Sequence, residues 1–273
     1  MQLQELNGDQ SRELINTAQR YSVWAEARKR YEGYRGSMSF VARNGVEYLL
    51  RDYYDPKSGV RRQKSLGRRD FSTERIFEAF TQGKVESADR RRAASDTLQR
   101  QAAVNRALRL GRVPEIAARI ARELDEAGLL GRGIKIVGTN ALFAYEAAAG
   151  VHLASELTTT EDMDMLFDAR ARIRLALEEG VEERTLLGLL RQADKSFART
   201  SRTFQAANAE GYLVDLIKPE RNPPWTIEAS SISDDRFDLE ASPIDGLAWH
   251  ESAPPFEALA IDARGFPVRL VVP

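Results

Sequence analysis

The chain has 273 residues, of which 42% are hydrophobic and 30% are charged, a composition typical of a folded protein with one large or two modest domains. It contains no cysteine and two histidines, which excludes disulfides and cysteine nucleophiles and argues against a zinc site built from histidine or thiolate. No segment approaches the roughly 18 apolar residues of a membrane span, and the first residues lack the basic and apolar regions of a signal peptide. We therefore expect a cytoplasmic protein.

The near-neutral net charge hides two halves of opposite sign. Residues 1–112 carry 23 Lys and Arg against 14 Asp and Glu, whereas residues 113–273 carry 17 against 27. Such an asymmetry indicates that the two halves make different contacts. Because Pro114 also fits the start of a helix, we place the domain boundary between a basic region, 1–112, and a core domain, 113–273.

The basic region begins with a predicted helix and a predicted β-meander. Apolar residues at helical spacing predict a helix over residues 9–34. Asn44-Gly45 stands between two β-type runs and is a strong signal for a two-residue hairpin. The run 55–59, Asp-Pro-Lys-Ser-Gly, predicts a further turn into a third strand. Ser72 or Thr73 is the expected cap of the next helix, which continues, with or without breaks, to residue 112.

Five cations lie on the third strand of this meander and just after it: Arg61, Arg62, Lys64, Arg68 and Arg69. With tyrosines nearby in sequence, such a cluster can bind an RNA or DNA backbone by neutralising phosphates. A solvated strand face beside an exposed turn explains it equally well. The same cations are also suitable for contact with the triphosphate of a nucleotide.

The core domain is expected to alternate helices and strands. Its hydrophobic patterns predict helices over 115–130, 139–149 and 185–197, a buried strand over 134–137, an acidic strand over 162–168, and two hairpins, 203–207 with 212–218 and 256–262 with 266–272.

Gly138-Thr139-Asn140 follows the buried strand and opens a helix. A Gly-Thr turn at a helix start exposes backbone N–H groups and a hydroxyl to an anion, as phosphate sites at helix N-termini do. Taken alone, however, such a pair is usually only a tight turn.

Asp162 and Asp164 lie two residues apart on a predicted strand, so their side chains project from the same face. Asp215 lies on a later strand between apolar neighbours, where an uncompensated carboxylate is disfavoured. Three converging carboxylates require a cation, and Mg²⁺ accepts hard oxygen ligands from carboxylates and phosphates. An Asp-x-Asp pair by itself often only caps a turn or lies on a solvated face.

The order of these pieces resembles the nucleotidyltransferase fold of the DNA polymerase β superfamily. More narrowly, the chain is similar to a bacterial family of nucleotidyltransferase-fold proteins in the segments 138–142, 145–146, 162–168 with Arg170, and 211–217. The resemblance implies an α+β protein with a mixed sheet flanked by helices, preceded here by the helical and β-meander region. Two features depart from the family pattern: Thr139 replaces a smaller residue, and Asp162 follows Gly138 by 24 positions. Family members generally continue into further helices, so we expect a C-terminally truncated form.

The resemblance also implies roles for these residues. Asp162 and Asp164 would bind two Mg²⁺ ions, and Asp215 would complete the site near the acceptor hydroxyl. Gly138 and Thr139 would hold the nucleotide phosphates. From their positions in the sequence, Asn140, Arg170 and Lys218 are further candidates for nucleotide binding, although surface ion pairing is the commoner use of an arginine such as Arg170 and the position of Lys218 is not diagnostic. The expected activity is Mg-dependent transfer of a nucleoside monophosphate from a nucleoside triphosphate such as ATP to a hydroxyl of RNA, in particular tRNA, of a protein or of a small molecule. The alternative is a non-catalytic protein that keeps the fold and binds nucleic acid or another partner.

Overall fold

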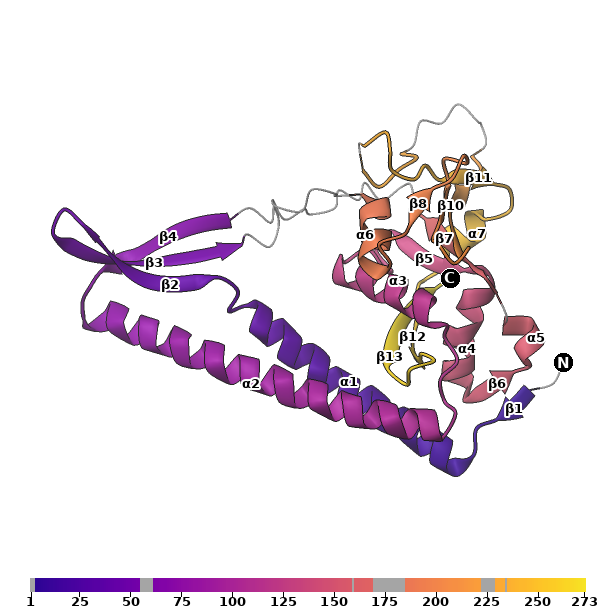
Figure 1. Ribbon diagram of the computed structural model, residues 1–273, viewed down its shortest axis with the longest axis horizontal. Helices are drawn as coiled ribbons and strands as arrows, with labels where there is room; N and C mark the ends of the chain where they lie inside the picture. Colours follow the sequence, from indigo (N-terminus) through magenta and orange to yellow (C-terminus); the bar gives the residue numbers. More distant parts are fainter. Residues whose placement is uncertain (1–2, 55–60, 159, 169–184, 222–228, 234) are drawn as a thin grey trace. The chain divides into compact units, whose positions relative to one another are not determined.

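The computed structural model describes residues 3–54, 61–158, 160–168, 185–221, 229–233 and 235–273 (Figure 1). The described residues form two compact units: one contains those before residue 16 and after residue 101, and the other contains residues 16–101. The units thus separate at residues 15 and 101, whereas the sequence-based boundary lies at residue 112. No helix in the described ranges is both long and apolar enough to cross a bilayer.

A mixed sheet forms the centre of the first unit. Its strands follow the order β5-β7-β10-β9-β8, and β11 pairs with the far end of β10. The pairs β7/β10 and β10/β11 are parallel, and the remaining pairs are antiparallel. The α+β class and the mixed sheet are therefore confirmed. The strand bounds are β5 (Ile134–Val137), β7 (Asp162–Phe167), β8 (Ala198–Arg199), β9 (Gln205–Ala207), β10 (Leu213–Pro219) and β11 (Ser242–Ile244).

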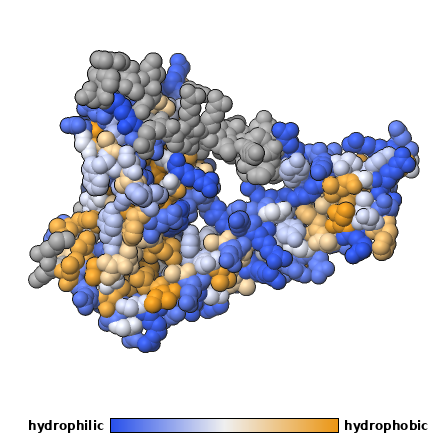
Figure 2. All heavy atoms as spheres, turned by 180° about the vertical axis from the view of Figure 1, so that it is seen from behind, coloured by the Kyte–Doolittle hydropathy of each residue, from blue (hydrophilic) through white to orange (hydrophobic). Residues whose placement is uncertain are grey.

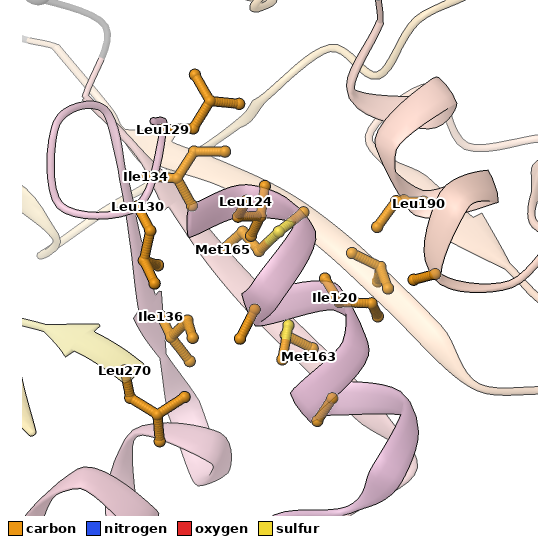
Figure 3. Packing of buried hydrophobic residues seen from close by; sticks show 14 of the residues in the cluster. Ile120, Leu124, Leu129, Leu130, Ile134, Ile136, Met163, Met165, Leu190 and Leu270 are labelled. Carbon is orange, nitrogen blue, oxygen red and sulfur yellow. The ribbon is translucent and has the colours of Figure 1, made fainter. Parts of the chain in front are cut away.

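The two faces of this sheet have different roles because side chains alternate along each strand. On one face Met163 and Met165 pack against Ile120 and Leu124 of α3 (Glu115–Glu126), and α6 (Leu186–Ala193) contributes Leu190 to the same cluster (Figure 3). Each fully buried side chain of this size stabilises the fold by about 1.5–3 kcal/mol. The alternate positions of β7 project from the opposite face, which is where the acidic residues lie.

The rest of the first unit supports the edges of this arrangement. The terminal hairpin of β12 and β13 is confirmed, and the last apolar residues, Leu270, Val271 and Val272, are buried in the core. Strand β1 pairs antiparallel with β6, so residues 3–5 join residues 151–153. The bounds are β1 (Leu3–Glu5), the 3₁₀ helix η1 (Gly138–Ala141), α4 (Leu142–Ala149), β6 (Val151–Leu153), α5 (Ser155–Thr158), α7 (Ala248–Ser252), β12 (Phe256–Ile261) and β13 (Pro267–Val272).

The second unit contains the predicted meander. Strands β2 (Ser37–Arg43), β3 (Val46–Tyr54) and β4 (Arg61–Arg68) pair antiparallel in chain order. Asn44 and Gly45 have φ angles of 51° and 77°, the positive values that a type I′ turn requires. The hairpin prediction is therefore confirmed. The predicted turn at 55–59 lies outside the described residues.

The long helices are α1 (Gly8–Glu32) and α2 (Phe71–Ala107). Asp70 caps α2, because its Oδ1 accepts from Thr73 N at 2.8 Å while Thr73 Oγ1 accepts from Asp70 N at 2.8 Å. The prediction that Ser72 or Thr73 is the cap was therefore wrong: Thr73 occupies the third helical position of a reciprocal capping pair. The helix has no break and ends at Ala107, before the predicted residue 112.

Helix α3 also ends earlier than predicted. It stops at Glu126 instead of residue 130, and Gly128 then adopts a left-handed φ of 70°. That conformation is easily reached by glycine and terminates helices. Leu129 and Leu130, which fall within the predicted helix, are instead buried in the turn that follows α3.

Candidate active site

Asp164 and Asp215 lie side by side on the face of the sheet opposite the core. They come from the adjacent parallel strands β7 and β10 and are directly opposite each other in the register. Strands pair at a spacing of about 4.8 Å, so the two carboxylates meet although 50 residues separate them in sequence. Both side chains are half-buried. The sequence-based prediction that these two acids converge agrees with this register.

Gly138 brings the backbone against this pair. It follows β5, has a left-handed φ of 65°, and begins η1. A Cβ atom at this position would overlap Asp164 Oδ2. Glycine is therefore required here for two reasons, backbone conformation and the close approach of the Asp164 carboxylate.

Asp162 begins β7 and is more exposed than Asp164. The hydroxyl of Thr160 donates to Asp162 Oδ1. The Asp162 carbonyl is held in place by two buried residues, because it accepts from Asn140 Nδ2 at 2.6 Å and from the Tyr212 hydroxyl at 3.1 Å. These bonds fix the start of the acidic strand beside η1 and β10.

The electrostatics of the cluster favour a bound cation. Burial, followed by the charges of Asp162 and Asp215, raises the pKa of Asp164 to about 6. Asp215 is partly compensated, since Gln205 Nε2 donates to its Oδ1 at 2.9 Å. Burial also raises the pKa of the Tyr212 hydroxyl, and the neighbouring charges of Asp162 and Asp164 raise it further. Tyr212 therefore stays a neutral hydrogen-bond donor.

A cavity of about 500 Å³ opens over the two carboxylates. Its lining combines charged, polar and apolar residues. Arg202 and His250 were not predicted from the sequence, because they reach the cavity from a loop and a short helix whose placement depends on tertiary packing. The lining residues are Val137, Gly138, Asp164, Arg202, Phe204, Asp215, Ile217, Ser242, Ile244, Leu247 and His250.

His250 is positioned by the anchoring of α7. Buried Lys135, on β5, donates to the carbonyls of His250 at 3.1 Å, Glu251 at 3.2 Å and Ala253 at 2.6 Å. Arg221 donates to both carboxylate oxygens of buried Glu251 at 2.9 Å. A cation at the C-terminal end of a helix satisfies carbonyls that have no helical partner. Two cations thus hold the short helix that presents His250 to the cavity, together with Leu247 just before it.

The donor set suits a metal that is shared with substrate phosphates. Within the described ranges, no group of three or more His, Cys, Asp or Glu side chains is arranged to hold a metal ion unaided. Mg²⁺, however, is commonly bound through one or two carboxylates, with phosphates and waters supplying the remaining ligands. Asp164 and Asp215 offer such a pair, and Asp162 adds a third negative charge beside it. The carboxylate pair therefore fits Mg²⁺.

A model of a nucleotidyltransferase family matches residues 115–273. The match covers more than half of the chain and includes Gly138, Asp164 and Asp215. The chain belongs to this nucleotidyltransferase family. No curated protein and no solved structure matches this chain. Membership supports a nucleotidyl-transfer function in general, and the carboxylate pair is the natural candidate for the centre of that chemistry.

The remaining residues predicted to bind nucleotide lie in different places. Thr139 is half-buried in η1 next to Gly138. Asn140 is 2% exposed, and its side-chain amide donates a hydrogen bond to the backbone of β7. It therefore supports the backbone beside the site. Lys218 is three residues after Asp215 and therefore projects from the other face of β10, where its ammonium donates to the Ala229 carbonyl at 3.2 Å. Arg170 lies outside the described residues.

The five basic residues on β4 and just after it include both paired and exposed cations. Arg69 donates to Glu47 at 2.8 Å and to Glu74 at 2.9 Å, which raises its pKa, so it has a structural role. Arg61 lies 3.7 Å from an Asp52 carboxylate oxygen, and Arg62 also has an interaction partner. Lys64 and Arg68 are exposed and make no ion pair with the residues that the structure describes. These two are the best placed of the five to meet an external anion.

Proposed function

We propose that this protein transfers a nucleoside monophosphate group from a nucleoside triphosphate to a hydroxyl acceptor and releases pyrophosphate. The observation that carries the proposal is the pairing of Asp164 and Asp215 across β7 and β10, next to Gly138 and facing a cavity, in a chain of a nucleotidyltransferase family. A general binding protein would not need two half-buried carboxylates side by side, because their mutual repulsion is unfavourable without a cation.

Different residues of the chain would have different roles in this reaction. Asp164 and Asp215, with Asp162 beside them, would hold Mg²⁺. Bound Mg²⁺ would supply charge stabilisation for the attacking and leaving oxygens of an in-line displacement. Asp215 would accept the proton of the acceptor hydroxyl, whose oxygen bonds to the α-phosphorus as the bond to the bridging oxygen breaks. Gln205 orients the Asp215 carboxylate for this role through its hydrogen bond. Gly138 and Thr139 would hold the phosphates at the start of η1.

RNA is the acceptor class that the charge distribution favours. Residues 16–101 carry 19 Lys and Arg against 11 Asp and Glu, although the whole chain is nearly neutral. Figure 2 shows that hydrophilic side chains predominate on the unit containing these residues in that view, interrupted by a group of apolar side chains. An excess of cations attracts a phosphate backbone independently of its sequence. A protein or a small molecule remains the alternative acceptor.

The test is a transfer assay with each labelled nucleoside triphosphate, Mg²⁺, and total cellular RNA or a protein extract. Wild-type protein should label one class of acceptor and release pyrophosphate. Asp164→Asn and Asp215→Asn should each reduce the rate by about 100-fold or more, since each removes a charge that acts in the transition state. Glu210→Gln, a change at an exposed acid away from the cavity, is the matched control and should leave the rate unchanged.

The transfer assay and binding measurements on the same variants together decide between an enzyme and a non-catalytic binding protein. The absence of labelling with every triphosphate and acceptor, together with salt-sensitive RNA binding that persists in Asp164→Asn, would support the non-catalytic alternative. Mg-dependent triphosphate binding that is lost in that variant would support the transferase.

A further inference from the structure

Arg202 lines the cavity that contains Asp164 and Asp215, and its backbone is held in a defined turn between β8 and β9. The Arg202 N–H donates to Thr200 Oγ1 at 3.1 Å, and the Arg202 carbonyl accepts from Gln205 N at 3.2 Å. The side chain of Gln205 in turn donates to Asp215 Oδ1. The turn that presents Arg202 is therefore connected directly to one of the paired carboxylates.

The charge of Arg202 has no partner among the residues that the structure describes. Of the described residues that line the cavity, Asp164, Asp215 and Arg202 are the ones with a full formal charge at neutral pH. Among the described residues, Arg202 forms no ion pair with either acid, and its guanidinium has no hydrogen-bond partner. An arginine that faces a cavity without a partner is suited to a ligand with two acceptor oxygens, because its planar fork matches phosphate bidentately.

We infer that Arg202 binds the β- and γ-phosphates of the nucleoside triphosphate, and this inference rests on the proposed function. The nucleobase and the acceptor hydroxyl are neutral, so they give a guanidinium no comparable attraction. A cation at this position also stabilises the charge that accumulates on pyrophosphate as it leaves. The carboxylates with their metal and the arginine would thus bind different parts of one substrate across the cavity.

The phosphate in contact with Arg202 has two conceivable sources, the triphosphate tail and the backbone of an RNA acceptor. The experiment therefore measures the affinity of the protein for Mg-tripolyphosphate, for the free nucleoside and for RNA separately, by calorimetry or by competition. Arg202→Ala should weaken Mg-tripolyphosphate by roughly 10–100-fold, the loss expected for a charge-assisted bidentate contact, and should leave nucleoside affinity unchanged. Arg202→Lys, which keeps the charge without the fork, should fall between the wild type and the alanine variant.

Arg236→Ala is the matched control. Arg236 is exposed, its guanidinium lies 4.6 Å from the ring centroid of Phe237, and it does not line the cavity. This variant should bind tripolyphosphate as wild type does. Equal thermal melting of the three variants would show that the fold is intact, as expected for substitutions at exposed side chains.

Two outcomes would overturn the inference. One is tripolyphosphate affinity in Arg202→Ala that equals the affinity in Arg236→Ala. The other is a loss of RNA affinity alone, which would assign Arg202 to the acceptor. Failure of the proposed function is distinguishable, because wild type would then show no nucleotidyl transfer while the Arg202-dependent binding of tripolyphosphate persisted.

Discussion

Asp164 is a carboxylate whose ionisation is opposed by its surroundings. Its pKa rises from an ordinary value near 3.8 to about 6 because it is partly buried and lies beside Asp162 and Asp215. The protonated form is therefore favoured in the folded state. Without a metal, the stability that Asp164 contributes is complete below about pH 4 and is lost as the pH rises through about 6.

This shift predicts how Asp164→Asn changes the stability of the metal-free protein. In EDTA, the variant should gain about 1 kcal/mol over wild type at about pH 8, after allowance for solvent screening, and little or nothing at about pH 4. Chemical unfolding at the two pH values measures the difference. Glu210→Gln is the control for charge removal at an exposed site. A gain that does not vary with pH would show that repulsion within the acid cluster is not its cause.

Gly138→Ala separates the two reasons for the glycine. The added Cβ overlaps the Asp164 carboxylate, so we expect transfer activity to fall by about 10-fold or more, with a loss of about 1–2 kcal/mol in unfolding free energy from the left-handed backbone. Gly150→Ala is a close control, since Gly150 has a φ of 67° and open space around its Cα. It should show the backbone cost without the loss of activity. Equal activity in the two variants would contradict this account of the site.

At the scale of elements, α7 is a five-residue helix that depends on contacts from other strands for its position. Its anchor is the Lys135 ammonium, which reaches three carbonyls at the helix end. Helices this short are not stable alone, so a substitution in β5 should affect the cavity wall formed by Leu247 and His250.

Lys135→Met keeps the length of the side chain and removes its three donated bonds. We expect a loss of about 1–3 kcal/mol in unfolding free energy, and weaker nucleotide binding as α7 shifts. Thermal or chemical unfolding and a triphosphate titration measure the two effects. Lys218→Met, which removes one bond at an exposed ammonium, should change both by much less. Wild-type stability in Lys135→Met would show that α7 is held by other contacts.

At the scale of the whole molecule, the excess of positive charge in residues 16–101 predicts salt-dependent RNA binding. Replacing both Lys64 and Arg68 with Gln should weaken RNA binding and reduce the slope of log affinity against log salt by about 1.5, as expected for two lost phosphate contacts. A salt titration of RNA binding measures this slope. Replacing Lys195 and Arg236 with Gln removes the same charge from the other unit and should leave the slope unchanged. Equal slopes in the two double variants would exclude β4 as an RNA-binding surface.

The sequence alone predicted the long helices, the β-meander, the strands that carry the acids and the acids themselves, but not the short elements β1, β6, α5, β8, β11 and α7. Period-2 alternation placed Asp162 and Asp164 on one face of a strand, and the apolar neighbours of Asp215 indicated a strand that carries a carboxylate for a reason. The Asn44-Gly45 hairpin and the terminal hairpin were also predicted correctly, because local turn chemistry and alternation determine them. The ends of α2 and α3 were less predictable, since capping at Asp70 and the turn at Gly128 compete with helix propensity there.

Only the tertiary structure decided which residues surround the acids. The parallel register of β7 and β10 sets Asp164 opposite Asp215, and packing of loops and a short helix brings Arg202 and His250 to the same cavity. Lys218 faces away although it is close to Asp215 in sequence. The physical reason is that residue spacing determines the face of a single strand, whereas neighbours across a sheet depend on strand pairing and on the packing of segments that are distant in sequence.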